Sequence, residues 1–181
     1  MLSDGDRRQL VDVAWRSVIA RVNGSRTLPA PSMLELPPAF GVFVTLKLDG
    51  RLRGCLGTLE SLSDLASEVV RCAADAASRD PRFPAVGPHE LDGLALEISV
   101  LGPFERIDPR RPDAVSIGLH GLLVERGRRR GLLLPQVATE WQWDVEQFLR
   151  QTCVKAGLAA EAWEGDAIVY RFTADVFGTR W

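Results

Sequence analysis

Apolar residues recur along this chain at two spacings, and these spacings divide it into helices and strands. Intervals of three and four residues place side chains on one helix face, and they predict helices over residues 4–22, 61–79 and 144–156. Strict alternation of apolar and polar residues predicts a half-buried strand over residues 94–101. Shorter apolar runs predict further strands at 42–48, 115–119, 122–125, 132–134 and 167–172.

Capping residues support the predicted helix boundaries. A short polar side chain at the first position of a helix accepts a hydrogen bond from a backbone N–H that has no partner within the helix. Ser3 or Asp4 is expected to cap the first helix, Ser61 or Ser63 the second, and Asp144 the third.

The order of these elements is typical of an α+β fold, in which a mainly antiparallel sheet packs against helices. A chain of 181 residues has the size of one domain, so we expect a single domain over residues 1–181. Turn-forming residues at 108–112 mark a boundary within it and predict a small second lobe around residues 104–135. Residues 135–143 are expected to form a loop.

Charge and composition argue against two classes of partner. The net charge of −2 and the isoelectric point near 5.7 create no field that would attract nucleic acid or an acidic membrane. The basic run at 126–131 suggests a nucleic-acid site, but it is short and lacks aromatic residues, which favours a solvated hairpin tip. No apolar stretch approaches the ~18 residues of a membrane span. We therefore expect binding to neither nucleic acid nor membrane.

Cysteine usage and the first residues indicate a compartment. The three cysteines are odd in number and widely spaced, which is typical of reduced thiols rather than a disulfide framework. Residues 3–6 are polar and acidic, unlike a signal peptide. We therefore expect a soluble cytoplasmic protein.

The candidate site lies in a predicted hairpin over residues 41–59. Asp49 and Gly50 stand between two strand-like runs, and both can take the positive φ that a two-residue hairpin turn requires. Such a turn fixes the register of the paired strands. The expected pairs are Leu48 with Arg51, Leu46 with Arg53, and Val44 with Cys55.

Arg53, Cys55 and the glycines beside them have two interpretations. In the first, Arg53 and Cys55 share one strand face, with Cys55 as a nucleophilic thiolate and Arg53 as the group that binds an anion. Gly54 and Gly57 would then leave backbone N–H groups open to a ligand. In the second, a glycine bulge near Gly54 lets a helix lie close to the sheet, and Cys55 is a small core residue. The pattern alone favours the second, because free cysteines are among the most buried residue types.

Several other polar residues are candidates for the same site. Asp80 and Arg82 follow the second helix, and they either line a polar cleft beside the hairpin or are solvated loop charges. His120 is a general base or a hydrogen-bonded turn residue, and the second is favoured because no partner pattern lies near it. Glu97 and Ser99 share the polar face of their strand and face either a cleft or water.

Several short motifs occur in an order that resembles one protein family. They are GVFVTL, LRGCLG, DPRF, LEISVL, HGLLV, LLLPQV and the KAGL run. Together they resemble the AMMECR-type domain, known in prokaryotes as AmmeMemoRadiSam system protein A, over nearly the whole chain. Leu56 stands where the hallmark pentapeptide usually has isoleucine. The resemblance implies an α+β fold and a partnership with a Memo-type protein and a radical SAM protein. It also favours a functional role for Asp80 and Arg82, but it supplies no reaction.

Motifs for metal and cofactor chemistry are absent from the sequence. The two histidines and three cysteines lack the spacing of metal ligands, and neither a phosphate-binding glycine loop nor a three-cysteine iron–sulfur motif occurs. We therefore expect no metal and no cofactor. Two hypotheses follow: an enzyme or ligand carrier whose site contains Cys55, Arg53, Asp80, Arg82 and His120, or a non-catalytic adaptor that docks the two partner proteins.

Overall fold

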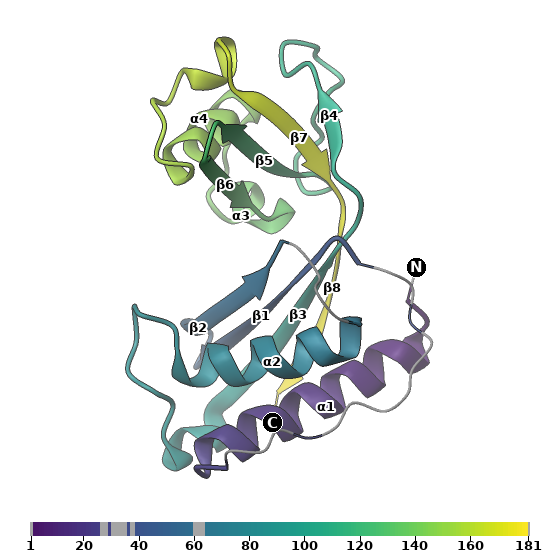
Figure 1. Ribbon diagram of the computed structural model, residues 1–181, viewed down its shortest axis with the longest axis vertical. Coiled ribbons are helices and arrows are strands. Elements are labelled where there is room, and N and C mark those ends of the chain that lie inside the picture. Colours follow the sequence, from purple (N-terminus) through teal and green to yellow (C-terminus); the bar gives the residue numbers. More distant parts are fainter. Residues whose placement is uncertain (1, 26–28, 30–35, 37–38, 60–63, 181) are drawn as a thin grey trace. The chain divides into compact units, whose positions relative to one another are not determined.

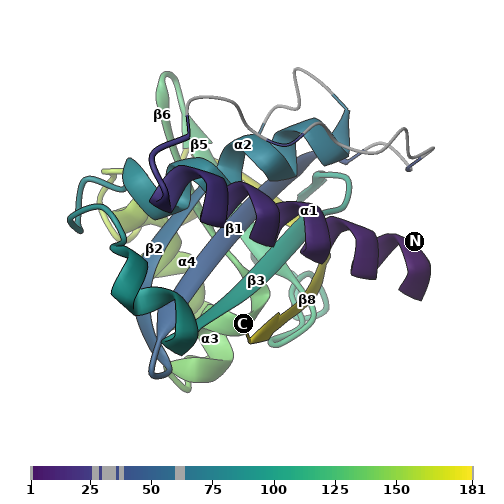
Figure 2. The ribbon, with the colours of Figure 1, turned by 90° about the horizontal axis from the view of Figure 1, so that it is seen from below.

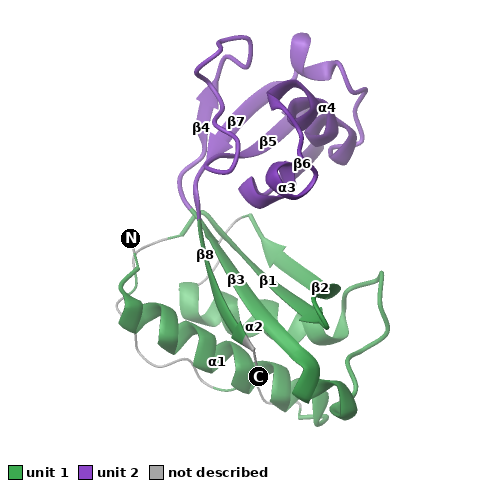
Figure 3. Ribbon diagram, turned by 180° about the vertical axis from the view of Figure 1, so that it is seen from behind, with its two compact units in different colours: residues 1–101, 175–181 green, residues 102–174 purple. Residues whose placement is uncertain are grey.

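The computed structural model describes residues 2–180 apart from 26–28, 30–35, 37–38 and 60–63. The chain divides into two compact units, one of residues 1–101 with 175–181 and one of residues 102–174 (Figure 3). It contains two antiparallel four-stranded sheets packed with helices, so the predicted α+β fold is confirmed. The small lobe predicted around residues 104–135 lies within the second unit.

The first unit is built on a sheet with the strand order β2-β1-β3-β8. Its strands are β1 (Gly41–Leu48), β2 (Arg51–Thr58), β3 (Leu94–Leu101) and β8 (Ala174–Arg180). Helices α1 (Asp4–Val22) and α2 (Leu65–Ser78) cover one face of this sheet (Figures 1 and 2), and the 3₁₀ helix η1 (Pro88–Gly93) precedes β3. Val42, Val44 and Leu46 of β1 are buried in the core beneath the helices. Phe43, Thr45 and Lys47, which alternate with them, therefore point to the opposite face.

Capping residues begin the helices largely as the sequence predicts. Ser3 caps α1 and Asp144 caps α4, each through a side-chain oxygen that accepts a backbone N–H of the first turn. The second helix is capped by Asp64 instead. Its predicted caps, Ser61 and Ser63, lie outside the described residues.

The predicted hairpin turn and the predicted pair of Leu48 with Arg51 are confirmed, but the register beyond this pair is not. Asp49 and Gly50 have φ angles of 50° and 79°, the conformation of a two-residue hairpin turn. A bulge between Leu46 and Lys47 then shifts the pairing, so that Arg53 is the extra residue and Cys55 opposes Thr45. The predicted opposition of Leu46 to Arg53 and of Val44 to Cys55 is wrong, since these residues of β1 pair with Gly54 and Leu56.

The second unit has a sheet with the strand order β4-β7-β5-β6. Its strands are β4 (Glu105–Ile107), β5 (Gly121–Arg126), β6 (Arg129–Leu133) and β7 (Ile168–Phe172). Helices α3 (Pro135–Glu140) and α4 (Val145–Lys155) pack against it, and the 3₁₀ helix η2 (Ala162–Glu164) leads toward β7. Phe148 and Leu149 of α4 are buried with Leu122, Val124 and Val169 of the strands.

Two local predictions for the second unit are wrong. Residues 115–119, predicted as a strand, lie in a turn region in which Gly118 has a φ of 82°, a conformation that breaks a strand. Residues 135–140, predicted as a loop, form α3. Pro135 is the first residue of this helix, a position where the missing N–H costs nothing.

Strand β8 was not predicted, because its residues form a strand only by pairing with β3, which is far away in the sequence. It directly follows β7 in the chain but joins the sheet of the first unit beside β3. Phe177 packs against the core of that unit, and Gly178 lies so close to β3 that a Cβ atom would be 2.0 Å from the Leu96 carbonyl oxygen. The close approach of two backbones explains the glycine.

Candidate functional site

Cys55 lies on β2, at the edge of the first unit's sheet, and points away from α1 and α2. Its neighbour Gly54 faces α2, where a Cβ atom would lie 2.2 Å from the Ala76 carbonyl oxygen, and side chains alternate along a strand. Cys55 is half-buried, whereas Cys72 and Cys153 are both 0% exposed. Of the three thiols, only that of Cys55 is open to reaction without unfolding.

A row of four polar side chains crosses three strands on this face. Thr45 opposes Cys55 on one side and Glu97 on the other, and its hydroxyl donates a hydrogen bond to Cys55 Sγ at 3.3 Å. Lys47 Nζ forms an ion pair with Glu97 Oε2, also at 3.3 Å. We call Cys55, Thr45, Glu97 and Lys47 the Cys55 row. It places a thiol, a hydroxyl, a carboxylate and an ammonium group on one sheet face.

Two members of the Cys55 row were missed by the sequence reasoning. Thr45 and Lys47 are the polar positions that alternate with the buried Val44 and Leu46, and this alternation was the available signal. Ser99, which was predicted to share a polar strand face with Glu97, is 1% exposed, and its hydroxyl has no hydrogen-bond partner within the described part of the chain.

Asp80 and Arg82 close the free edge of β2 at Cys55. Asp80 Oδ2 accepts the Cys55 N–H at 2.8 Å, and Arg82 Nη2 donates to the Cys55 carbonyl oxygen at 3.4 Å. The two side chains also pair with each other, with Arg82 Nη2 at 2.7 Å from Asp80 Oδ2. They thus occupy backbone groups that an edge strand leaves open, and they hold the strand in place around the thiol.

The electrostatics of this pair follow from its burial. The Asp80 side chain is 2% exposed and that of Arg82 is 52% exposed. The Arg82 guanidinium holds the pKa of the Asp80 carboxyl well below its usual range, with help from the Cys55 N–H. Asp80 is therefore a charged, hydrogen-bonded anchor at neutral pH rather than a proton donor.

Arg53 contacts a loop and not the thiol. Its Nε and Nη2 donate to the two carboxylate oxygens of Glu90 at 2.7 and 2.9 Å, and its Nη1 and Nη2 donate to the carbonyl oxygens of Pro84 and Ala85. The expected adjacency of the Arg53 guanidinium to Cys55 is replaced by these contacts, because the bulge makes Arg53 the extra residue. The guanidinium that contacts Cys55 is that of Arg82.

The glycines around Cys55 allow close packing. Gly54 lets α2 approach the sheet, as described above. At Gly57 a Cβ atom would lie 2.3 Å from the Val42 carbonyl oxygen and 2.4 Å from the Phe43 ring. Both positions agree with the interpretation of the glycines as packing residues, and a ligand-binding role for them stays a prediction.

His120 belongs to the second unit and has a local partner. Its Nδ1 accepts the Ser116 N–H at 3.0 Å within a turn. Burial lowers the pKa of His120, and the nearby Arg171 guanidinium lowers it further. These contacts match the interpretation of a turn residue, and a role in catalysis stays a prediction.

The basic run at the tip of the β5–β6 hairpin is largely engaged by its own unit. Arg126 pairs with Asp166 at 3.0 Å, Arg130 lies 3.6 Å from Glu125, and Arg129 donates to the Gly157 carbonyl oxygen. These contacts stabilise the tip of the β5–β6 hairpin.

The described part of the chain lacks two features, a cluster of metal ligands and a helix able to span a membrane. No three histidine, cysteine, aspartate or glutamate side chains within the described ranges gather as metal ligands do. Among the helices described for this chain, none combines the length and apolar character that crossing a bilayer would need.

These features define a class of protein: a two-unit α+β fold in which an Asp-Pro-Arg loop braces a cysteine on an edge strand. The model of one family, AMMECR1, matches residues 11–177, and this chain belongs to the AMMECR1 family. The match spans both units.

Relatives and a solved structure support the assignment. The chain is similar to a protein of Methanothermobacter thermautotrophicus, with 45% identity over 97% of this chain and 95% of the relative. It is 45% identical to Protein TK0174 of Thermococcus kodakarensis, over 93% of this chain and 87% of that protein. The crystal structure of Uncharacterized Protein PH0010 from Pyrococcus horikoshii superposes with a TM-score of 0.89 at 38% identity, covering 98% of this chain and 93% of that one.

Proposed function

We propose that this AMMECR1-family protein is a thiol-dependent enzyme or carrier that captures a small electrophilic substrate at Cys55. One observation carries the proposal: the sulfur of the half-buried Cys55 accepts the Thr45 hydroxyl, and the Cys55 backbone is fixed by Asp80 and Arg82. A nucleophile held by surrounding hydrogen bonds needs little reorganisation to react. A cysteine that only filled space would require none of these contacts.

The minimal reaction is addition of the thiol to a carbonyl carbon. The sulfur–carbon bond forms, the carbonyl π bond breaks, and the thiol proton ends on the former carbonyl oxygen, so that no further reactant is required. Lys47 and Glu97 are the groups of the Cys55 row that can move this proton, since they form an ion pair between β1, the strand next to Cys55, and β3 beyond it. Thr45 would hold the sulfur in place during the addition.

The proposal is tested by measuring how fast each cysteine of the native protein reacts with iodoacetamide at neutral pH. Burial raises the pKa of Cys72 to about 12 and also raises that of Cys153. Compared with an ordinary thiol of pKa about 8.5, Cys72 holds roughly three thousandfold less thiolate. Peptide mass spectrometry is therefore expected to show alkylation of Cys55 long before either buried thiol.

Two matched variants sharpen the test. Cys55→Ser is expected to remove the fast alkylation, whereas Cys153→Ser, the same change at a buried thiol, is expected to preserve it. A native protein in which Cys55 reacts no faster than Cys72 would overturn the proposal. Mass spectrometry of the intact protein with and without Cys55→Ser would then show whether a small molecule from the cell is attached at this residue.

We further propose that the protein acts together with a Memo-type protein and a radical SAM protein, as part of an AmmeMemoRadiSam system in the cytoplasm. The family resemblance of the sequence motifs supports this partnership. Co-expression of the three proteins followed by purification through one of them is the test. A chain that elutes alone at micromolar concentration would contradict it.

The second candidate function is that of a non-catalytic adaptor for the same partners. It is favoured by large apolar side chains on the surface of the second unit, where Trp141 is 67% exposed and Leu119 is 56% exposed. Trp141→Ala is expected to weaken partner capture if this function holds. Val176→Ala, at a residue of the first unit that is 40% exposed, is the control. Loss of capture with Trp141→Ala together with an unreactive Cys55 would favour the adaptor.

A further inference from the structure

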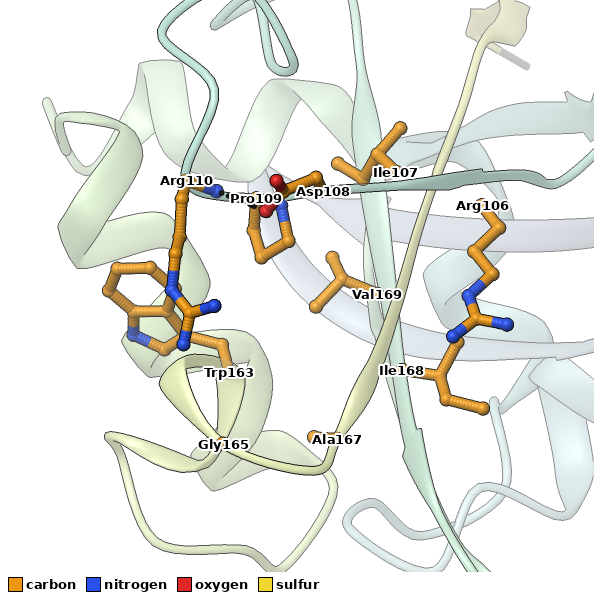
Figure 4. Close-up of a pocket in the computed structure, with 10 residues that line it drawn as sticks. All are labelled: Arg106, Ile107, Asp108, Pro109, Arg110, Trp163, Gly165, Ala167, Ile168 and Val169. Atoms are coloured by element: carbon orange, nitrogen blue, oxygen red, sulfur yellow. Dashed lines mark hydrogen bonds between the residues drawn. The ribbon is translucent and has the colours of Figure 1, made fainter.

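A cleft of about 460 Å³ opens on the second unit, which does not contain Cys55. Figure 4 shows its lining, which comes from two segments that are far apart in the sequence. One is residues 106–110, formed by β4 and the loop after it, and the other runs from Trp163 in η2 to Val169 in β7. The volume falls within the range of small-molecule sites, roughly 300–1,000 Å³.

The floor of the cleft is apolar and fixed by the sheet. Ile107 and Val169 are paired directly across β4 and β7, and Val169 is 1% exposed. The indole of Trp163 lies at one end, next to the side chain of Arg110 (Figure 4). An apolar floor with an aromatic side chain at one end suits the flat, apolar part of a ligand.

Two arginines line the cleft: Arg110 lies beside Trp163, and Arg106 lies beside Ile168, across β7 from Val169 (Figure 4). Within the described part of the chain, neither Arg106 nor Arg110 forms an ion pair with a carboxylate. Arg110 donates to the Glu164 carbonyl oxygen, which holds its side chain over the cleft and leaves its charge uncompensated. Asp108 also lines the cleft, but its Oδ1 accepts the Arg110 backbone N–H at 3.1 Å.

The charge of the lining favours an anion. Two guanidinium groups against one carboxylate leave an excess of one positive charge, in a chain whose net charge is −2. Guanidinium groups bind carboxylate and phosphate oxygens through paired N–H donors. Other arginines in this unit have carboxylate partners: Arg111 pairs with Asp113, and Arg171 pairs with Glu105.

We propose that this cleft binds a small organic anion, with its carboxylate or phosphate group on Arg106 or Arg110 and its flat apolar part on Ile107 and Trp163. The site is independent of the chemistry proposed at Cys55. The volume of the cleft suits a small molecule, and its two arginines without carboxylate partners favour a negatively charged one.

The test uses three probes with the same ring and different head groups: benzoate, phenyl phosphate and uncharged benzyl alcohol. Binding to the full chain is followed by the indole N–H resonance of Trp163 in a nitrogen-correlated NMR spectrum, assigned with Trp163→Phe. At least one anion is expected to shift this resonance saturably in the millimolar range, and benzyl alcohol at least about fivefold more weakly. The anion that binds more tightly identifies the head group.

Charge-matched variants complete the test. Arg110→Gln and Arg106→Gln each remove a cleft cation, and at least one is expected to weaken binding about fivefold or more. Arg128→Gln removes the same charge from the β5–β6 hairpin tip and is expected to leave binding within about twofold, because only the general field of the protein changes. Equal binding of benzyl alcohol, no shift with either anion, or an equal loss in Arg128→Gln would overturn the proposal.

Discussion

The substitution Asp80→Asn tests whether the Asp-Pro-Arg loop braces the strand that carries Cys55. The Asp80 carboxylate accepts the Cys55 N–H at 2.8 Å and the Arg82 Nε and Nη2 groups at 2.9 and 2.7 Å. Asparagine keeps the shape of the side chain but replaces one accepting oxygen with an NH₂ group. At least one of these donors then loses its acceptor.

The cost of the substitution depends on the hydrogen bonds that Asp80 loses. A hydrogen bond to a charged acceptor contributes about 1.5–3 kcal/mol, and Asp80 is almost fully buried, so water cannot replace the lost bond to Cys55. The Arg82 side chain is 52% exposed, so water can solvate its guanidinium when the contact with Asp80 is lost. The loss of this contact therefore adds little to the cost. We expect Asp80→Asn to lower the free energy of unfolding by about 2 kcal/mol.

The effect has a defined pH dependence. Because the pKa of Asp80 is lowered in the folded protein, its ionised form stabilises the fold above the unfolded pKa of about 4. This contribution is lost as the pH falls through the lower, folded pKa. The difference between the wild type and Asp80→Asn should therefore be constant from about pH 5 to 8 and shrink below about pH 4.

Urea denaturation followed by circular dichroism measures the change, and amide hydrogen exchange at Cys55 reports the freed N–H directly. Asp12→Asn is the matched control, because Asp12 lies in α1 of the same unit with a side chain that is 71% exposed. Its effect should stay within about 0.5 kcal/mol. If Asp80→Asn behaves like Asp12→Asn and the Cys55 amide stays protected, the bracing role is refuted.

Two further substitutions test the packing around Cys55. Gly54→Ala should lower the free energy of unfolding by about 3 kcal/mol in urea denaturation, because the new Cβ atom meets the α2 backbone. The control, Gly5→Ala in the first turn of α1, should be neutral or stabilising. Equal effects of the two substitutions would contradict the close packing at Gly54. Arg53→Lys should cost about 1–2 kcal/mol, since lysine cannot form the paired contact with Glu90, and the same change at the exposed Arg51 should cost almost nothing. Equal stability of the two lysine variants would show that the paired contact adds nothing.

Local signals in the sequence were sufficient for the elements that depend on neighbouring residues. The turn at Asp49 and Gly50, the cap at Ser3 and the alternation of residues 94–101 all act within a few positions of the chain. Turn conformation, capping and side-chain alternation are properties of short segments, so they can be inferred before any tertiary contact is known. The thiol at Cys55 and the Asp80–Arg82 motif were also visible as candidates.

Their arrangement was decided by contacts between distant segments. The bulge at Arg53 arises where Gly54 meets α2, and it turns the guanidinium toward Glu90. Sequence alone carries no measure of how closely a helix approaches a strand, so it could not say which arginine contacts Cys55. For the same reason β8 was missed, since its residues form a strand only beside β3. The sequence by itself determined the local elements and the chemical groups, and the tertiary structure decided which groups meet, because packing distance is a property of the whole chain.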